Sequence, residues 1–211
     1  LGTASTQSLT APVRLETWAE LNGVSSEKNQ YRYDVSTKPG TLAAPYANKV
    51  SGEYEQIADA DNTLLSVQLF SLNRGAKIEY MINNDGVWLP YEDVIRIKDD
   101  TVLLIRTEKD GVYSDAVSYV YTFTPLAPVI ELPSGTYSET KYTKISLDSR
   151  APKDREYTIM YRRNGDDKDV RYTGAEIEID HTMSIKAYVI EDGSGKTSKN
   201  RINYYVIDRA A

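Results

Sequence analysis

The segment Ser134-Gly135-Thr136-Tyr137 decides the fold class of this chain, because it repeats the earlier segment Ser51-Gly52-Glu53-Tyr54. Each segment follows an Ala-Pro pair, at 44–45 and at 127–128, after the same spacing of five residues. The two copies lie 83 residues apart, from position 51 to position 134. Self-similarity at a fixed offset indicates a duplicated structural unit.

Further matches follow in the same order in both copies. The matched segments share an alternation of apolar and polar residues, which is typical of strands with one buried face. We align, in order, Val67-Gln68-Leu69 with Ile145-Ser146-Leu147, Ile78-Glu79-Tyr80 with Ile159-Met160-Tyr161, Ile105-Arg106-Thr107 with Ile185-Lys186-Ala187, and Ser114 with Ser198.

A third copy contains only the second half of the repeat. Val13–Trp18 aligns with Met183–Tyr188 without a gap, and Asn22–Tyr33 aligns with Asp110–Tyr121. The sequence therefore predicts the C-terminal half of a truncated repeat at 1–37 and sandwich repeats at 38–124 and 125–211. Proline-containing joints at 38–45 and 124–128 predict semi-rigid connections. Because the chain starts without Met or a signal-peptide pattern, we expect a fragment or processed product of a longer protein.

Strand patterns and turn signals fill the rest of the chain. Val, Ile, Thr and Tyr are abundant in the alternating runs, and no window of helical length carries an apolar stripe. Five Asx-Gly pairs separate the runs and suit the positive φ angles of hairpin turns. The sequence therefore predicts an all-β chain of sandwiches or barrels. The pairs are Asn22-Gly23, Asp85-Gly86, Asp110-Gly111, Asn164-Gly165 and Asp192-Gly193.

The third repeat carries a series of short motifs in a characteristic order: Pro133–Tyr137, Ile159–Tyr161, Asn164-Gly165, Tyr172-Thr173-Gly174, Ile185–Ala187, Ser198 and Tyr205. This order resembles the chitobiase/β-hexosaminidase C-terminal domain family. The second repeat departs from it, with Tyr91-Glu92-Asp93 in place of Tyr-Thr-Gly. The resemblance implies tandem immunoglobulin-like and fibronectin-III-like β-sandwich modules. It also implies an accessory role in a secreted or cell-surface bacterial protein, and it transfers no catalytic residue.

Composition excludes several classes of function. The 211 residues carry a formal net charge of −6, which argues against a nucleic-acid surface. The chain has no Cys and one His, so thiol chemistry, Cys-based metal sites and a Ser–His–Asp triad are poor candidates. No apolar stretch is long enough to insert into a membrane. We expect no catalytic residue, no cofactor and no metal.

Tyr is abundant, with 17 residues, and eight of them recur as four pairs at equivalent positions of the two complete repeats. Recurrence indicates core packing. Trp88 does not recur, and with Tyr91 and Tyr113 it is the candidate platform for a glycan or protein partner. The alternative is a Trp that caps the end of the sandwich core. The recurring pairs are Tyr54 with Tyr137, Tyr80 with Tyr161, Tyr91 with Tyr172, and Tyr121 with Tyr205.

Acidic turns form a second group of candidates. Asp59 and Asp61 alternate as the ligands of a calcium loop do, but the Gly and Glu that complete an EF-hand are missing. The alternative is a solvated turn in which Asp bonds to the backbone. His181 lies in a turn without a second His or Cys nearby, and we assign it no role.

Two functions remain. The first is a non-catalytic structural spacer or accessory array, elongated in solution, which contacts adjacent domains of its parent protein. The second is a carbohydrate-binding or adhesive module that uses the aromatics around Trp88 and takes a glycan or cell-wall polysaccharide. The two strands of the half repeat leave an unpaired sheet edge, so we also expect them to pair with the next module or with another molecule.

Overall fold

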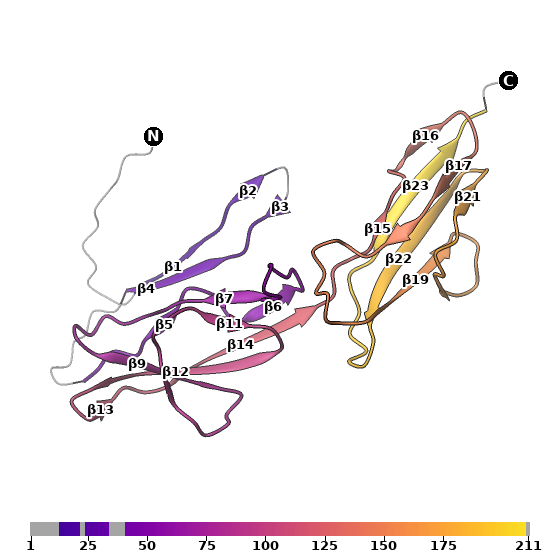
Figure 1. The fold of residues 1–211 in the computed structure, drawn as a ribbon. Helices are drawn as coiled ribbons and strands as arrows, with labels where there is room; N and C mark the ends of the chain where they lie inside the picture. Colours follow the sequence, from indigo (N-terminus) through magenta and orange to yellow (C-terminus); the bar gives the residue numbers. More distant parts are fainter. Residues whose placement is uncertain (1–12, 22–23, 34–40, 210–211) are drawn as a thin grey trace. The chain divides into compact units, whose positions relative to one another are not determined.

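The computed structural model describes residues 13–21, 24–33 and 41–209. The start of the chain, the Asn22-Gly23 turn and part of the first joint, at 38–40, lie outside these residues. Strands and their connections make up the described chain, which contains no helix and therefore none that could cross a membrane (Figure 1). The all-β prediction is confirmed.

The chain divides into two compact units. Unit 1 comprises the described residues up to Glu53 together with Leu65–Thr122, and unit 2 comprises Tyr54–Leu64 and the described residues from Phe123 onward. The domain boundaries drawn from the sequence, at 38 and 125, stay predictions.

Unit 2 is built from two layers of strands. One sheet has the order β16-β23-β22-β19-β20, with β16 parallel to β23 and the other pairs antiparallel. Two short pairs, β15 with β18 and β17 with β21, form the facing layer. The strands are β15 (Val129–Ile130), β16 (Gly135–Tyr137), β17 (Lys141–Thr143), β18 (Ile145–Ser146), β19 (Tyr157–Arg163), β20 (Val170–Arg171), β21 (Ile177–Ile179), β22 (Met183–Glu191) and β23 (Arg201–Ile207).

Unit 1 repeats this order. Its main sheet runs β10-β9-β12-β14-β6, with β13 paired to β12, and the pairs β5 with β8 and β7 with β11 face it. This strand order defines an immunoglobulin-like and fibronectin-III-like sandwich in each unit. The strands are β5 (Tyr46–Ala47), β6 (Gly52–Glu55), β7 (Leu65–Val67), β8 (Leu69–Phe70), β9 (Lys77–Ile82), β10 (Leu89–Pro90), β11 (Ile95–Ile97), β12 (Thr101–Lys109), β13 (Val112–Tyr113) and β14 (Val117–Thr124).

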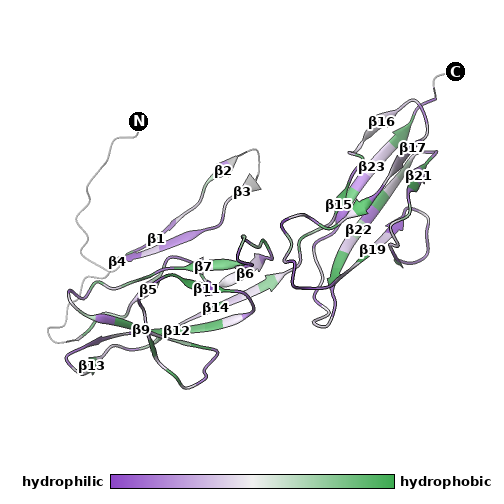
Figure 2. Ribbon diagram, viewed as in Figure 1, coloured by the Kyte–Doolittle hydropathy of each residue, from purple (hydrophilic) through white to green (hydrophobic). Residues whose placement is uncertain are grey.

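The cores follow from the alternation of the central strands. Along β12 and β22 every second residue is buried, and the strand ribbons alternate in hydropathy (Figure 2). Tyr121 and Tyr205 are 0% and 1% exposed. Their hydroxyls donate to equivalent carbonyls, of Lys49 at 3.1 Å and of Leu132 at 2.9 Å. These recurring Tyr residues are therefore core positions, as the sequence predicts.

The Asx-Gly pairs lie in turns wherever the structure describes them. Gly86, Gly111, Gly165 and Gly193 all have positive φ, between 77° and 93°. An added side chain would strain the backbone at each of these positions.

A recurring Ser closes the hairpin between the last two strands of the repeat. The Ser198 hydroxyl accepts a hydrogen bond from the Val189 N–H at 2.9 Å, and the Ser198 N–H donates to the Val189 carbonyl at 2.9 Å. The same hydroxyl donates to the Lys199 carbonyl at 2.8 Å. The equivalent pairs in the other copies are Ser114 with Thr107 and Ser26 with Ala19.

We expect Ser198→Ala to lower the free energy of unfolding by about 1–2 kcal/mol, because the Val189 N–H loses its acceptor. Urea unfolding followed by circular dichroism measures the change. The exposed Ser149→Ala is the control and should stay within about 0.5 kcal/mol of the parent chain. Equal effects of the two substitutions would contradict the role of Ser198.

The described part of the half repeat is the same hairpin in a third copy. It comprises β1 (Val13–Thr17), β2 (Glu20–Leu21), β3 (Val24–Ser25) and β4 (Asn29–Tyr33). Val13 pairs with Tyr33, as Thr101 pairs with Tyr121 at an offset of 88 (13 to 101, 33 to 121). The β2–β3 pairs match those of β12 and β13 at the same offset.

Two segments of the sequence alignment are wrong by two residues. The shared Ser bonds make Thr107 equivalent to Val189, so Ile105 corresponds to Ala187 and not to Ile185. In the same way the pairing of β8 and β18 makes Leu69, rather than Val67, equivalent to Ile145. A slip of two residues keeps every side chain on its face, so the alternating pattern does not reveal it.

Candidate functional site

Trp88 and Tyr113 meet around Arg106 on the outer face of the main sheet of unit 1. Arg106 lies on β12 and points away from the core. Its guanidinium carbon is 4.0 Å from the centroid of the Trp88 ring and 4.0 Å from that of the Tyr113 ring. Trp88 precedes β10 and Tyr113 lies on β13, so the two rings reach Arg106 from opposite sides of β12. We call these three residues the aromatic–arginine cluster.

The charge of Arg106 is already paired. Its Nε donates to the Glu79 carboxylate at 2.8 Å, and its Nη2 lies 2.7 Å from the same carboxylate oxygen. Both side chains are about one quarter exposed. The Tyr113 residue is 51% exposed, whereas Trp88 is half-buried. The surface that the cluster offers to a ligand is therefore mainly the Tyr113 ring.

Tyr91 is not part of this cluster. Its N–H donates to the Ile78 carbonyl at 2.9 Å, and Ile78 lies on the core-facing side of β9. In unit 2 the equivalent Tyr172 bonds to Ile159 in the same way, and its ring packs edge-on against Tyr161 with centroids 5.7 Å apart. The structure thus brings two of the three candidate aromatics together and places Tyr91 on the opposite face of the sheet.

The sequence does not identify Arg106 as a member of the aromatic–arginine cluster. We aligned it with Lys186, but the register makes Tyr188 its equivalent. The contacts with Trp88 and Tyr113 depend on cross-strand register, and that cannot be read from the residues alone.

We expect Arg106→Ala to destabilise unit 1 by about 1–2 kcal/mol, because it removes two cation–π contacts and a half-buried ion pair. Trp88 and Trp18 are the only Trp residues of the chain and both belong to unit 1, so Trp fluorescence during urea unfolding follows this unit. Arg106→Lys should recover only part of the loss, since an ammonium group cannot stack as a planar guanidinium does. Full recovery by Lys would show that charge alone matters.

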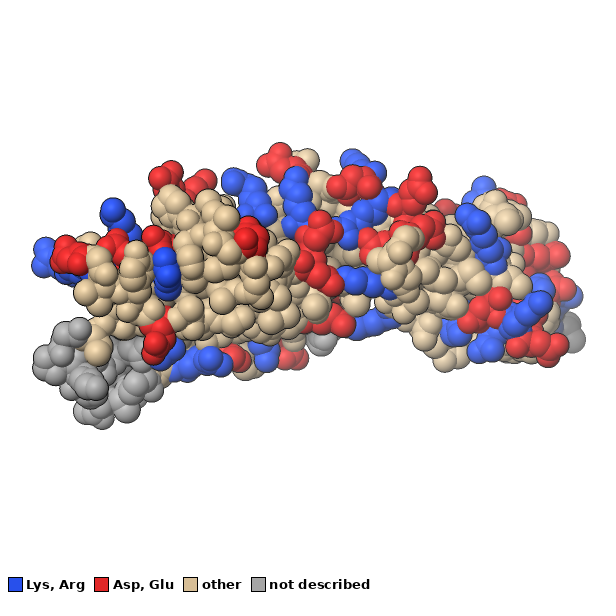
Figure 3. Space-filling model, turned by 90° about the horizontal axis from the view of Figure 1, so that it is seen from below, with Lys and Arg blue, Asp and Glu red and all other residues tan. Residues whose placement is uncertain are grey.

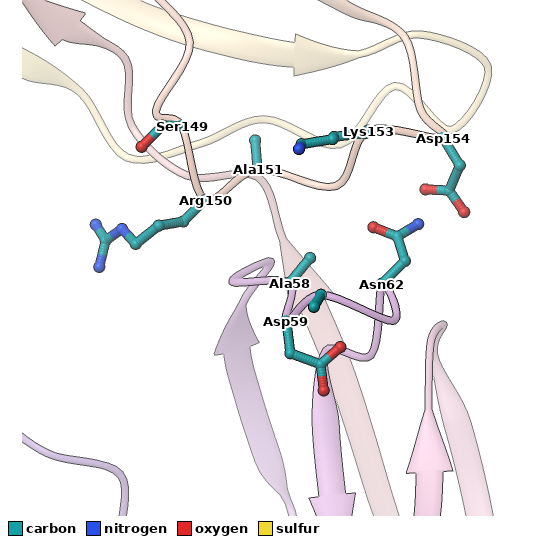
Figure 4. Close-up of a pocket in the computed structure, with 9 residues that line it drawn as sticks. Ala58, Asp59, Asn62, Ser149, Arg150, Ala151, Lys153 and Asp154 are labelled. Carbon is teal, nitrogen blue, oxygen red and sulfur yellow. The ribbon is translucent and has the colours of Figure 1, made fainter.

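A cavity of about 520 Å³ lies in unit 2, next to the Asp59 turn (Figure 4). The Asp59 carboxylate accepts hydrogen bonds from the Asp61 and Thr63 N–H groups at 2.9 and 2.8 Å. Asn62 adopts a positive φ of 62° at the tip of the turn. Asp59 therefore supports its own turn. No group of three His, Cys, Asp or Glu side chains is placed to hold a metal within the ranges that the structure describes.

A buried polar network lies elsewhere in unit 2. Glu191 is 6% exposed, and its carboxylate lies 2.6 Å from Arg155 and accepts from the Ser194 hydroxyl at 2.6 Å. Gln56 is fully buried and donates to the same carboxylate at 3.3 Å. Tyr157 donates to the Gln56 amide oxygen at 2.9 Å. Nothing in the sequence pointed to this network, because Gln56 and Glu191 are 135 residues apart.

The network also shifts two acid–base equilibria. Burial alone would raise the pKa of Glu191, but the hydrogen bonds from Ser194, Arg155 and Gln56 outweigh it, and the pKa lies below its ordinary value. Burial raises the pKa of Tyr157 to about 12, with the Glu191 charge acting in the same direction. The network therefore keeps the carboxylate ionised and the phenol neutral, as structural ion pairs do.

The remaining titratable candidates lie at the surface. His181 Nδ1 is 2.6 Å from the Asp180 carboxylate, and this hydrogen bond lowers the pKa of Asp180. Both side chains are more than half exposed. Basic and acidic side chains are interleaved on the face seen in Figure 3. That face offers no broad area of one sign.

Comparisons with known proteins find only distant structural similarity. No protein-family model and no curated protein matches the chain. It is similar to the chicken interferon gamma receptor alpha chain at 9% identity, over 79% of this chain and 100% of that one, with a TM-score of 0.40. It is similar to the FN1–FN3 domains of chicken CNTN1 at 12% identity (92% and 77% covered, TM-score 0.27). It is also similar, at 13% identity, to a Dscam chain from a structure that addresses isoform specificity. This match covers 86% of this chain and 51% of that one, with a TM-score of 0.31.

Because these scores are below 0.5 and these identities below 25%, the likenesses carry no functional argument. The fold assignment stands on the strand order and register of the chain itself.

Proposed function

We propose that this chain is a structural spacer or accessory array of an extracellular protein, in which sandwich modules hold neighbouring parts of the parent protein in place. The observation that carries the proposal is that recurring polar side chains bond to the backbone of their own module. Ser51 and Ser134 accept from the Val120 and Tyr204 N–H groups, both at 3.0 Å. The extracellular setting rests on the motif order of the third repeat, which resembles domains of secreted and cell-surface proteins.

The finer form of the proposal places the array in a bacterial surface protein or a polysaccharide-degrading enzyme. It rests on the motif order of the third repeat and on its resemblance to the chitobiase/β-hexosaminidase C-terminal domains. Mixing the chain with chitin, starch and peptidoglycan and assaying released reducing ends tests the non-catalytic part. We expect no turnover, and turnover by the purified chain would overturn it.

Force spectroscopy tests the spacer role directly. In unit 2, β16 runs parallel to β23 over three residue pairs, so a pull along these strands loads their hydrogen bonds together. We expect discrete unfolding events of whole modules when the chain is stretched between terminal handles. Smooth extension without discrete events would contradict a load-bearing module.

A carbohydrate-binding or adhesive role is the second candidate, and the exposed ring of Tyr113 favours it. Aromatic faces stack on the apolar faces of sugar rings. Binding on a glycan array should fall at least tenfold with Tyr113→Ala and stay unchanged with Tyr142→Ala, a Tyr of similar exposure in unit 2. Equal loss with both variants, or no binding by the parent chain, would remove this candidate.

A further inference from the structure

A groove of about 370 Å³ lies on the outer face of the main sheet of unit 2, beside the Asn164-Gly165 turn. Side chains from β19, β22 and β23 line it. Lys186, Ile202 and Tyr204 alternate along their strands with buried residues, so they point away from the core. The volume falls within the range of about 300–1,000 Å³ that is typical of small-molecule sites.

The same backbone arrangement occurs in unit 1, which fixes the equivalent positions. The Asn164 side-chain oxygen accepts from the Ser184 N–H at 2.7 Å, and the Asn164 N–H donates to the Ser184 carbonyl at 3.0 Å. Asn83 forms the same two bonds with Val102, at 2.8 and 2.7 Å. Ser184 of unit 2 is therefore equivalent to Val102 of unit 1.

Strand pairing extends this equivalence across the groove. Ser184 pairs with Tyr204 as Val102 pairs with Val120, and the residues two positions further along the central strands, Lys186 and Leu104, are equivalent in the same way. The sandwich of unit 1 forms with apolar residues at three groove positions, so the fold does not require the polar and aromatic groups of unit 2. The replacements are Arg162 for Met81, Lys186 for Leu104 and Tyr204 for Val120.

The groove carries an excess of positive charge. Three cationic side chains line it, together with the carboxylate of Asp166, which lies 3.4 Å from Arg163. The other two cations, Arg162 and Lys186, share one carboxylate, because they lie 3.4 and 3.2 Å from the same oxygen of Asp169. One carboxylate cannot neutralise two cations, and the Arg162 side chain is 41% exposed. The groove therefore favours an anionic ligand.

The aromatic side chain narrows the class of anion. Tyr204 is 63% exposed and Ile202 beside it is 43% exposed. A tyrosine ring stacks on the apolar face of a sugar ring, and a guanidinium group pairs with a carboxylate through charge-assisted hydrogen bonds. A uronic acid carries both features in one residue. An acidic peptide would satisfy the charges but offer the Tyr204 ring no matching flat face.

We propose that this groove binds a uronic acid residue of an acidic glycan. Tyr204 lies against the face of the sugar ring, and Arg162 and Lys186 pair with its carboxylate. The site belongs to unit 2 and is separate from the aromatic–arginine cluster of unit 1. This inference rests on neither proposed function, because a spacer module can carry such a site on its exposed sheet face.

Nuclear magnetic resonance titration of the full chain with trigalacturonic acid tests the ligand class. We expect a dissociation constant of about 1 mM or tighter, with shifts centred on the groove. The methyl-esterified trisaccharide keeps the sugar rings without the charge, and a tri-aspartate peptide keeps the charge without the rings. Each should bind at least about tenfold more weakly. No binding of trigalacturonic acid up to about 10 mM, or equal binding of tri-aspartate, would overturn the proposal.

A variant that carries the residues of unit 1 tests the site. Arg162→Met, Lys186→Leu and Tyr204→Val together should leave the circular dichroism spectrum unchanged and weaken binding at least about tenfold. Tyr204→Ala alone should also weaken binding about tenfold, and it serves if the triple variant does not fold. Tyr142→Ala and Tyr113→Ala are the controls and should leave the affinity unchanged. Loss of binding with Tyr113→Ala, or full binding by the triple variant, would contradict a site in this groove.

Discussion

Replacing Tyr205 by Ala should lower the free energy of unfolding of unit 2 by about 4 kcal/mol, the largest effect that we expect from a single substitution. The side chain is 1% exposed and packs within the core cluster of unit 2. Its ring lies 6.4 Å from the Tyr137 ring, centroid to centroid. Its hydroxyl bonds to the Leu132 carbonyl. Removing it leaves a cavity in the core, and the Leu132 carbonyl keeps only its hydrogen bond from the Asn203 amide at 2.8 Å.

Two further variants serve as controls for this measurement. Tyr205→Phe keeps the ring and loses only the hydrogen bond, so about 1 kcal/mol is expected. Tyr204→Ala changes the neighbouring residue, which is 63% exposed, and should stay within about 0.5 kcal/mol of the parent. Denaturant unfolding followed by far-ultraviolet circular dichroism gives all three values. A Tyr204 variant as unstable as the Tyr205 variant would show that the assigned faces of β23 are wrong.

The second large effect concerns Glu191. Glu191→Ala should cost about 2–3 kcal/mol, because it removes a buried carboxylate that pairs with the Arg155 guanidinium and accepts from the buried Gln56 amide. Glu156→Ala, which removes an exposed carboxylate next to Arg155 in the sequence, is the control and should have little effect. Equal stability of the two variants would contradict the structural importance of the network.

The same carboxylate predicts a pH dependence. Its pKa is lowered in the folded state, so the unfolded chain binds the proton first as pH falls. The stability that it contributes is present above the unfolded value of about 4.3 and is lost as pH falls through the lower folded value. The parent chain should therefore lose more stability than Glu191→Gln when the pH falls from 6 to about 3. Parallel losses in both chains would contradict the shift.

Most of the fold could be predicted from the sequence, because repetition and alternation survive divergence. The Ser-Gly-x-Tyr pairs, the Asx-Gly turns and the half copy all appear in the structure where described residues allow comparison. The exact register was less accessible. Ile105 was aligned two residues away from its structural equivalent, because a shift of two leaves the buried face unchanged. Hydrogen bonds of Ser114 and Ser198, not side-chain pattern, fix the correct register.

The candidate site was predictable only in part. Trp88 stood out because it does not recur, and it does come together with Tyr113 around Arg106. Arg106 looked like an ordinary strand residue, and its position between the two rings depends on cross-strand neighbours. Tyr91 had the signature of a core residue, since Tyr172 recurs at its position, and the structure places it on the core-facing side of the sheet. Recurrence of a residue at equivalent repeat positions therefore predicted its place in the fold better than its closeness to Trp88 in the sequence did.

The central claim is that one strand hairpin occurs three times in the same register. Cross-strand nuclear Overhauser contacts between backbone protons measure this directly. The account predicts contacts for Leu15 with Tyr31, Leu103 with Tyr119 and Ile185 with Asn203. If Leu15 instead contacts a residue two positions away from Tyr31, the first hairpin is not a copy of the other two, and the repeat account fails.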